Sequence, residues 1–429
     1  MKRSTLIAIG TVGLMALAGC STTPTPQSGD GSDGQDDQGG LSGELSFLSP
    51  WTQAQTAPMI EAYAEENPDA TINVTYIAGN ENAQQLLATQ LAAGNAPDVF
   101  YLNPGAGSPT SVGVLGEAGY LADLTEQEWA ADLEEPYRSF LSHDGAVYAY
   151  PSTIFGIGAM YNQTMLDEAG LEAPQTWSDL LAFCGDATEA GHPAFVLGAG
   201  AVWINAVIPY ALASTLVDSQ DPDFEAGVGT ETDFTDSEWV TVLEQYGEMV
   251  EAGCFQENPT GTDGPSTWGI AGAGEVFGVV APGALLSEVQ AAAAEGAEFM
   301  MHALPATDDA SETTMPVSLS STLGVNAASE SPELALDFVN WLSASEQLAM
   351  IASLQAGAVP TIASDDFEAP AAIAVVEELS SAGRTTPVPD LSWPNPEVQA
   401  ALQSGAQGML LGSSTPQQVT EAMQAAATQ

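Results

Sequence analysis

Residues 44–102 alternate between short apolar segments and amphipathic segments of helical period, and this alternation constrains the fold more than any other feature of the chain. ELSFL, TINVTYI and PDVFYL have the length and composition of strands, and 56–68 and 81–94 between them have the period of helices. Strand–helix–strand–helix–strand with short links predicts a doubly wound α/β unit. The ligand crevice of such a unit lies beyond the carboxyl ends of its strands, here at 49–53, 78–82 and 103–107.

A second α/β region is predicted from residue 152. It begins with a strand at 152–162 and a helix at 176–191, in which Thr176 and Asp179 form a capping box. Strands are also expected at 194–198, 274–283 and 298–303, and helices near 203–217 and at 236–253. The final third is predicted to be helical, at 331–343, 345–354, 368–381, 396–411 and 415–428. The whole chain is therefore expected to be an α/β protein.

The N-terminal segment indicates export. A basic pair precedes an apolar run at 6–18, which is too short for a stable membrane span and has the length of a signal-peptide core. The motif LAGC at 17–20 resembles the bacterial lipobox, so we expect a lipoprotein signal peptide at 1–19 and a lipid on Cys20. The polar segment 20–43 then forms a flexible spacer, because it cannot bury enough apolar surface to become ordered. An ordinary signal peptide with an incidental cysteine is the alternative.

The charge balance excludes several classes of function. The chain has 57 Asp and Glu residues against 4 Lys and Arg, a formal net charge of −53. Beyond the expected signal peptide, Arg138 and Arg384 are the only basic residues of these two types, and no lysine remains. Nucleic acid is excluded as a partner because phosphate binding needs clustered Lys and Arg. Schiff-base, pyridoxal and P-loop chemistries are excluded because they need a lysine.

The acidic residues are scattered along the whole chain. This distribution is typical of the solvated surface of a protein from a salt-rich, halophilic environment, where screening weakens the mutual repulsion of the charges. A trap for cationic ligands is the other interpretation.

The cysteines indicate a disulfide rather than a metal site. With Cys20 lipidated, Cys184 and Cys254 are an even pair in an oxidising compartment, which favours a bond between them. No spacing of Cys and His resembles a zinc site, and we expect neither a metal nor a cofactor.

Motifs in a fixed order run through the chain. Within 144–184 they are DGAVYAYP, a strand ending in YN, AGL and PQTW, and outside that segment they are LAAGNAPDVFYLN (91–103), GYLADLT (119–125), LGVNAASESPELALDFVNWLSASEQ (323–347) and AGAVPTIAS (356–364). Together they resemble the family 1 extracellular solute-binding proteins of carbohydrate ABC importers, over residues 44–428. One departure is APGALL at 281–286, where the family often has a Gly-Trp and hence a stacking ring.

The resemblance implies a two-lobed periplasmic-binding-protein-like fold with a hinge and a central ligand cleft. Lobe I would comprise 44–151 and 305–360, and lobe II 152–304 and 361–429. The implied protein is a monomer and not an enzyme. It would lie outside the cytoplasm, tied to the cell membrane by its lipid anchor alone. It would capture a mono- or oligosaccharide and deliver it to ABC permease subunits, whose partner ATPase hydrolyses ATP.

Candidate ligand-binding residues follow from the chemistry of a sugar, which has an apolar C–H face for stacking on a ring and a hydroxyl rim that needs donors and acceptors. The ring candidates stand outside amphipathic helices and are Trp51, Trp203, Trp268 and Trp393. The polar candidates stand in predicted loops at the crevice and are Gln53, Asn80, Glu81, Asn103 and Asp263. Phe155 and Tyr101 are weaker ring candidates. Packing roles are expected for Trp129, Trp177, Trp239 and Trp341.

Two other functions stay open. A polyamine or other cationic solute receptor on the same fold would also use tryptophans and carboxylates, through cation–π contacts and ion pairs. A secreted glycoside hydrolase would need two carboxyl groups facing each other across the scissile bond. The order of the elements does not resemble a hydrolase barrel or sandwich.

Overall fold

The computed structural model describes residues 41–429 of the chain, except for 50, 77–79, 107, 134–136 and 363–365. The expected signal peptide, the lipid attachment at Cys20 and most of the spacer lie outside the described residues. Gly40–Gln429 is one compact unit. In its described part, no helix combines the length and the apolar character needed to cross a bilayer.

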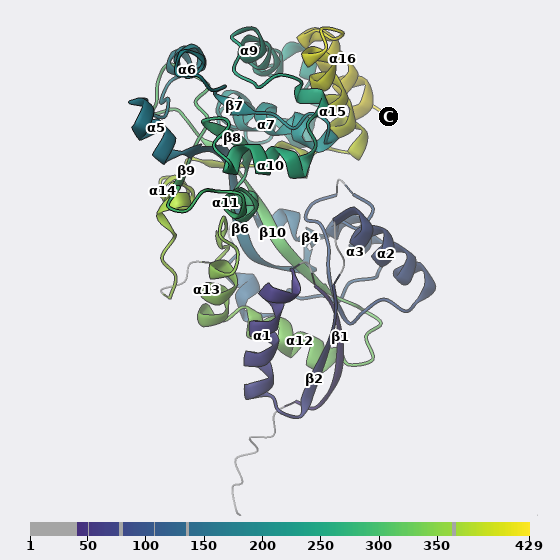
Figure 1. Ribbon diagram of the computed structural model, residues 1–429. Helices are drawn as coiled ribbons and strands as arrows, with labels where there is room; N and C mark the ends of the chain where they lie inside the picture. Colours follow the sequence, from purple (N-terminus) through teal and green to yellow (C-terminus); the bar gives the residue numbers. More distant parts are fainter. Residues whose placement is uncertain (1–40, 50, 77–79, 107, 134–136, 363–365) are drawn as a thin grey trace, which may run out of the picture. The chain divides into compact units, whose positions relative to one another are not determined.

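The predicted strand–helix alternation forms one side of a ten-stranded sheet (Figure 1). Strands β1 (Gly43–Ser49), β2 (Ala70–Tyr76) and β3 (Val99–Tyr101) are joined through helices α1 (Gln53–Glu66) and α2 (Asn80–Ala93). β1 lies between the other two strands and is parallel to both, with Phe47 opposite Val74 on one side and Val99 on the other. The doubly wound arrangement predicted for this part of the chain is therefore confirmed.

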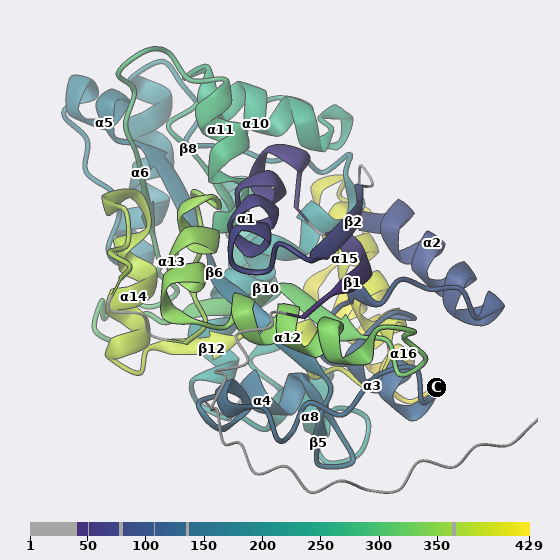
Figure 2. The same ribbon diagram turned by 90° about the horizontal axis from the view of Figure 1, so that it is seen from below.

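Two long antiparallel strands form the middle of the sheet and lie side by side in Figures 1 and 2. β6 (Ala149–Asn162) and β10 (Met315–Val325) pair from Ala149 opposite Gly324 to Gly156 opposite Val317. β6 confirms the strand predicted at 152–162. β10 was not predicted over its full length, because its hydroxyl-rich sequence SLSST is typical of a loop.

β6 changes its partners halfway along its length. It pairs with β8 (Gly278–Pro282) along one edge from Ile157 and with β9 (Phe299–His302) along the other from Ala159. The strand order is β2-β1-β3-β10-β6-β8-β7, and β7 is Phe195–Val196. The short strands β11 (Val359–Pro360) and β12 (Thr385–Pro387) pair with β6 and β10. The two predicted α/β regions therefore share one sheet.

The remaining elements cover this sheet or connect its strands. Before β6 they are α3 (Val112–Glu117), α4 (Tyr137–Phe140), β4 (Ser142–His143) and β5 (Ala146–Val147). Between β6 and β10 they are α5 (Gln163–Ala169), α6 (Trp177–Glu189), α7 (Val207–Ala213), α8 (Phe224–Gly227), α9 (Trp239–Glu251), α10 (Gly264–Gly272) and α11 (Leu286–Ala291). After β10 they are α12 (Pro332–Leu342), α13 (Ser345–Ser353), α14 (Ala374–Ser381), α15 (Pro396–Leu410) and α16 (Pro416–Ala427).

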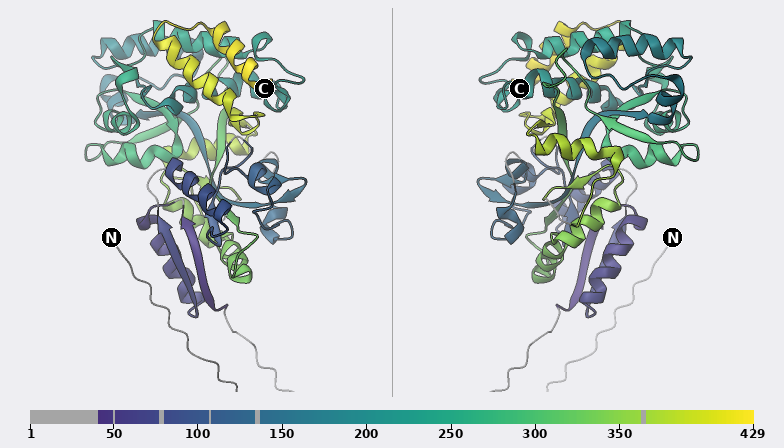
Figure 3. Two further views of the ribbon diagram at one scale, coloured as in Figure 1. Left: turned by 90° about the vertical axis from the view of Figure 1, so that its right-hand side faces the viewer. Right: turned by 90° about the vertical axis from the view of Figure 1, so that its left-hand side faces the viewer.

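The predicted helices form where amphipathic period and capping residues agree. Thr176 caps α6 by accepting a hydrogen bond from the Asp179 backbone N–H, at 3.2 Å. Helices α12, α13, α15 and α16 match their predicted ranges to within a few residues. α15 and α16 lie side by side (Figure 3), and their contact is close at Gly405, where an added Cβ would stand 2.5 Å from Val419.

Three local predictions were wrong in detail. The helix expected near 203–217 is three pieces: a 3₁₀ turn η2 (Val202–Ala206), α7, and a π-helical turn η3 (Ser214–Asp218). Trp268, expected outside a helix, lies in α10, which forms because Asp263 caps it and a proline follows at the first turn. The helix expected from 368 begins only at Ala374, after a short 3₁₀ turn.

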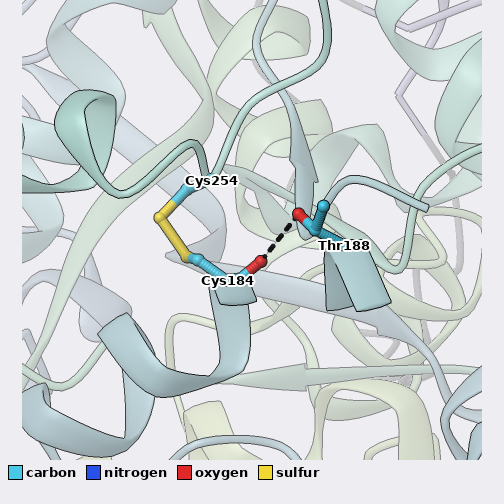
Figure 4. The surroundings of a disulfide bond; sticks show 3 residues. All are labelled: Cys184, Thr188 and Cys254. Carbon is cyan, nitrogen blue, oxygen red and sulfur yellow. Dashed lines mark hydrogen bonds between the residues drawn. A yellow bond between two sulfur atoms is a disulfide. The ribbon is translucent and has the colours of Figure 1, made fainter. Parts of the chain in front are cut away.

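The predicted disulfide between Cys184 and Cys254 is present (Figure 4). It joins α6 to Cys254, which lies in the segment after the end of α9 at Glu251. On α6 the Thr188 hydroxyl donates a hydrogen bond to the Cys184 carbonyl, at 3.0 Å. Both cysteines are fully buried, so the bond ties α6 to the end of α9 beneath the surface.

We expect the double substitution Cys184→Ser and Cys254→Ser to lower the free energy of unfolding by about 4 kcal/mol, because the bond closes a loop with a sequence separation of 70 residues. Denaturant unfolding of the oxidised protein and the variant measures the difference. Cys20→Ser is the matched control and should leave the unfolding midpoint unchanged. A double variant as stable as the parent chain would contradict the prediction.

Candidate functional site

A cavity of about 500 Å³ is lined by residues from widely separated parts of the sequence. They come from β3 and the loop after it, from α2, from the middle of β6 and β10, from the end of β8, from η2 and α7, and from α15 and the segment that leads into it. They are Gln84, Tyr101, Asn103, Pro104, Ser108, Phe155, Ile157, Trp203, Val207, Tyr210, Pro282, Ser318, Leu319, Ser320, Val388, Asp390, Leu391, Trp393, Asn395, Pro396, Gln399 and Gln403. The cavity therefore includes one of the strand ends at which a crevice was predicted.

The two long strands supply one set of lining residues. Phe155 and Ile157 on β6 are two residues apart and so point to the same face of the sheet. Ser318 on β10 pairs with Phe155 in the register of the two strands, and Ser320 follows two residues later. Hydroxyl groups and apolar side chains thus alternate across this part of the cavity.

Asn103 lines the cavity where β3 ends, as predicted for that crevice position. Its side-chain amide has a fixed orientation: the oxygen accepts a hydrogen bond from the Tyr101 hydroxyl at 3.0 Å, and the nitrogen donates to Ser108 Oγ at 2.8 Å. All three residues line the cavity. This arrangement gives a preorganised polar edge next to the Tyr101 ring.

A second polar group lies at η8 (Pro389–Leu391) and the start of α15. Gln399 Nε2 donates hydrogen bonds to Asp390 Oδ2 and, at 3.4 Å, to the Tyr210 hydroxyl. Burial raises the pKa of Asp390 to about 7, although hydrogen bonds from its surroundings, including Tyr210 and Gln399, oppose the rise. Asp390 is the only carboxyl among the described lining residues, in a chain with 57 Asp and Glu.

Two of the predicted tryptophans line the cavity and differ in exposure. Trp203, in η2, is 42% exposed, which is unusual for a large apolar side chain. Trp393, between η8 and α15, is only 2% exposed and contacts the Tyr210 ring edge-on, with centroids 5.8 Å apart. The ring of Trp203 offers an apolar surface on which a sugar face or a cation can rest, whereas Trp393 is almost fully covered and forms part of the cavity wall.

The other predicted ligand residues do not lie among the lining residues. Trp51 is 6% exposed and packs edge-on against Phe47, and Gln53 is exposed at the start of α1. Trp268 is buried in α10 behind Trp203, with ring centroids 6.2 Å apart. Asp263 is exposed and caps α10 by accepting from the Ser266 N–H at 2.9 Å, so its local role is structural.

Asn80 and Glu81 are the first two residues of α2, and their side chains lie outside the description. Gln84, one turn further along the same helix, does line the cavity.

The packing roles expected for four other tryptophans agree with their contacts. Trp129 and Trp239 are buried, and the indole N–H groups of Trp177 and Trp341 donate to Glu248 and Glu66. Three lining residues were not predicted from the sequence, and they are Tyr210, Asp390 and Gln399. Tyr210 stands in an apolar helix and has the sequence context of a core residue. Asp390 and Gln399 have the sequence context of ordinary surface polar residues.

A second hollow, of about 520 Å³, differs in chemistry. Its lining includes Glu126, Glu128 and Asp132 but one ring only, Trp129, whose indole N–H donates to Asn340 at 3.0 Å. An acidic hollow of this kind lacks the stacking surfaces found in the first cavity. We therefore take the first cavity as the candidate site.

We expect Asp390→Asn to change how stability depends on pH. In the folded protein the carboxyl keeps its proton up to about pH 7, whereas an unfolded Asp releases it near ~3.9, so wild-type stability falls as the pH rises through that window. The variant should show a smaller fall between pH 4 and pH 8 in urea unfolding. Asp309→Asn, an exposed carboxyl whose pKa is lowered by Ser311, is the control and should not reduce the fall. Parallel pH profiles for Asp390→Asn and wild type would contradict the prediction.

Residues 58–375 match the family model described as bacterial extracellular solute-binding protein. The melibiose/raffinose/stachyose-binding protein MelE of Bacillus subtilis is 29% identical over 121 residues, which cover 28% of this chain and 26% of MelE. The multiple sugar-binding protein of Streptococcus mutans is 25% identical over 145 residues, covering 34% and 33%. The matched stretches thus span about a third or less of these relatives.

The fold is shared with solved solute-binding proteins over nearly the whole chain. The structure of RafE in complex with raffinose has a TM-score of 0.74 and 16% sequence identity, and the match covers 90% of this chain and 99% of that one. The fold is therefore that of the two-lobed periplasmic solute-binding proteins, as expected, while the lobe boundaries given above stay a prediction. Because the family model matches well over half of its length, the chain belongs to the bacterial extracellular solute-binding protein family.

Proposed function

We propose that the protein is the substrate-binding component of an ABC importer and that its cavity binds a mono- or oligosaccharide. The observation that carries this proposal is the chemistry of the lining. Rings from Trp203, Trp393, Tyr210, Tyr101 and Phe155 occur together with side-chain amides and hydroxyls, and with a single carboxyl. Relatives named for binding melibiose, raffinose, stachyose or multiple sugars support the same conclusion.

The lining suits the two faces of a pyranose ring. Aromatic rings can stack on its apolar C–H face, and side-chain amides such as those of Asn103 and Gln399 both donate and accept, as sugar hydroxyls require. A volume of about 500 Å³ lies within the range of small-molecule sites. Neutral dipolar groups of this kind select a neutral, hydroxyl-rich solute.

A cationic solute such as a polyamine is the second candidate, because Asp390 stands near Tyr210 and Trp393 in the cavity. A carboxylate among rings is a recognised cation-binding arrangement. Two facts weigh against it here: Asp390 already accepts a hydrogen bond from Gln399, and burial raises its pKa to about 7. A counter-ion that is only partly ionised at neutral pH is a weak anchor for a permanent cation.

Hydrolysis fits the lining poorly. A glycoside hydrolase of the usual kind needs two carboxyl groups at the scissile bond, and the described lining residues provide one. The relatives are named as binding proteins. We infer a protein that binds and releases its solute unchanged, and leaves ATP hydrolysis to the ATPase that works with the permease.

The location follows from the N-terminal sequence and the family. We infer that the chain is exported, lipid-anchored at Cys20 and held at the outer side of the cell membrane by the spacer that follows. Its acidic surface suits a salt-rich medium, because screening by salt weakens the repulsion between the carboxylates.

A thermal-shift panel tests the proposed ligand class. The panel contains raffinose, stachyose, melibiose and a xylo-oligosaccharide, with spermidine and putrescine as cationic competitors. At 100 times its dissociation constant, a true ligand should add about 2.7 kcal/mol to the free energy of unfolding and raise the melting temperature. A rise with the polyamines alone would overturn the carbohydrate assignment in favour of the cationic one.

We expect Trp203→Ala to weaken binding of the active saccharide by about tenfold or more, since loss of one aromatic contact costs on the order of 1.4 kcal/mol. Isothermal titration calorimetry gives the affinity. Trp177→Ala is the matched control, because Trp177 is also partly exposed and donates its indole N–H to Glu248 rather than lining the cavity. Equal affinities of the Trp203 variant and wild type would remove Trp203 from the site.

A further inference from the structure

Two buried carboxyl groups lie behind the Trp393 wall of the cavity. Asp218 ends the π-helical turn η3, and Glu225 lies in the short helix α8. Asp218 is 5% exposed and Glu225 is 4% exposed. Neither carboxyl lines the cavity among the described residues, and nothing in the proposed binding chemistry uses them directly.

Glu225 joins two tryptophans through its two oxygens. Oε1 accepts the indole N–H of Trp239 at 2.8 Å, and Oε2 accepts the indole N–H of Trp393. The two rings lie 5.9 Å apart, and Phe234 contacts both edge-on. Trp239 is a fully buried core residue of α9, whereas Trp393 reaches the cavity. One carboxyl therefore connects the core to the cavity wall.

Asp218 is the carboxyl next to Glu225, and its Oδ2 has no hydrogen-bond partner among the described residues. Because both oxygens of Glu225 already accept N–H donors, a proton between the two acids belongs on Asp218. Burial raises the pKa of both groups, that of Asp218 well above its usual range and that of Glu225 to about 7.

Within the part of the chain that the structure describes, no cationic side chain takes part in this arrangement. Besides Asp218, two titratable groups interact electrostatically with Glu225, and they are Asp390 of η8 and Tyr210 of α7. Arg384 donates to the carbonyls of Thr313 and Ala310, and Arg138 donates to the carbonyl of Ala130. The indole N–H groups are thus the neutral donors that take the place of a counter-ion for Glu225.

We propose that Glu225 is the positioning residue for Trp393 and fixes the plane of that ring in the cavity wall. Trp393 lies between η8 and α15, in a stretch with no helical or strand hydrogen bonds of its own. Its edge-on contacts with Tyr210 and Phe234 pack the ring, and the bond to Glu225 sets its rotation. The inference rests on the proposed function, because it concerns the wall of the same cavity.

Two conservative variants separate this role from simple packing. Glu225→Gln keeps the shape but offers one acceptor oxygen and one NH₂ group, so one of the two indole N–H groups faces a donor. Asp218→Asn keeps a donor toward Glu225 and needs no titrating proton. The first variant should release Trp393 and the second should hold it. Trp239→Phe and Trp393→Phe identify the two indole signals among those of the 8 tryptophans.

The first readout needs no ligand. In ¹⁵N-labelled protein at a pH well above 7, where Glu225 is ionised, the indole N–H signals of Trp239 and Trp393 should lie downfield, because bonds to a carboxylate are short and strong. We expect at least the Trp393 signal to move in Glu225→Gln and to stay in place in Asp218→Asn. If the Trp393 signal does not move in Glu225→Gln, the proposal is overturned.

The second readout is affinity for raffinose, or for the saccharide of the panel that stabilises the protein most. Glu225→Gln should raise the dissociation constant about tenfold, and Asp218→Asn should leave it within about threefold. In the Trp393→Phe background, Glu225→Gln should have no further effect, because the bond it breaks is already gone. Equal losses in both carboxyl variants, or unchanged affinity in Glu225→Gln, would overturn the positioning role.

The two readouts fail independently. If wild type binds no saccharide but Glu225→Gln still moves the Trp393 signal, the proposed function is wrong and the anchoring of the ring stands. If saccharides bind and the signal does not move, the proposed function stands and this inference is wrong.

Discussion

The constraint on which this structure depends is the near absence of cations. With 57 Asp and Glu in the chain and two arginines in its described part, a buried carboxyl must find neutral hydrogen-bond donors. Asp98, at the start of β3, accepts from the Ser46 backbone N–H at 2.8 Å and from the hydroxyls of Ser46 and Ser329, both at 2.6 Å. Partial burial opposes ionisation, but these hydrogen bonds lower the pKa of Asp98. Glu225 uses two indoles in the same way.

This constraint also makes the cavity stand out. The acids of this chain are spread over its whole length, yet the described cavity lining has a single carboxyl, and that one accepts a hydrogen bond from a glutamine. The lining is built from segments that the sheet brings together: the end of β3, the middle of β6 and β10, and the approach to α15. The ring of Trp393 is tied to the core through Glu225, so the cavity wall and the packing behind it form one hydrogen-bonded unit.

Local signals made much of the fold predictable. β1 to β3 and their helices follow from period and short links, and the Cys184–Cys254 bond follows from cysteine count and compartment. β10 could not be predicted in full, because its serines and threonines become strand residues only through long-range pairing with β6. At the site, Asn103, Trp203 and Trp393 were within reach because each stands outside a regular amphipathic pattern. Asp390 was not, since nothing local distinguishes it from the other acids.

The change of partners along β6 has a mechanical consequence. Gly156 is the last residue paired with β10, Ile157 is the first paired with β8, and a Cβ at Gly156 or Gly158 would stand within 2.4 Å of a neighbouring atom. If the strands on one side of this point turn against those on the other, the main chain of β6 must absorb part of the twist as torsion over these few residues. Phe155 and Ile157, which line the cavity, flank Gly156. A molecule that rests on those two side chains therefore restrains the torsion of β6. Occupation of the cavity would then also stiffen the sheet at this point.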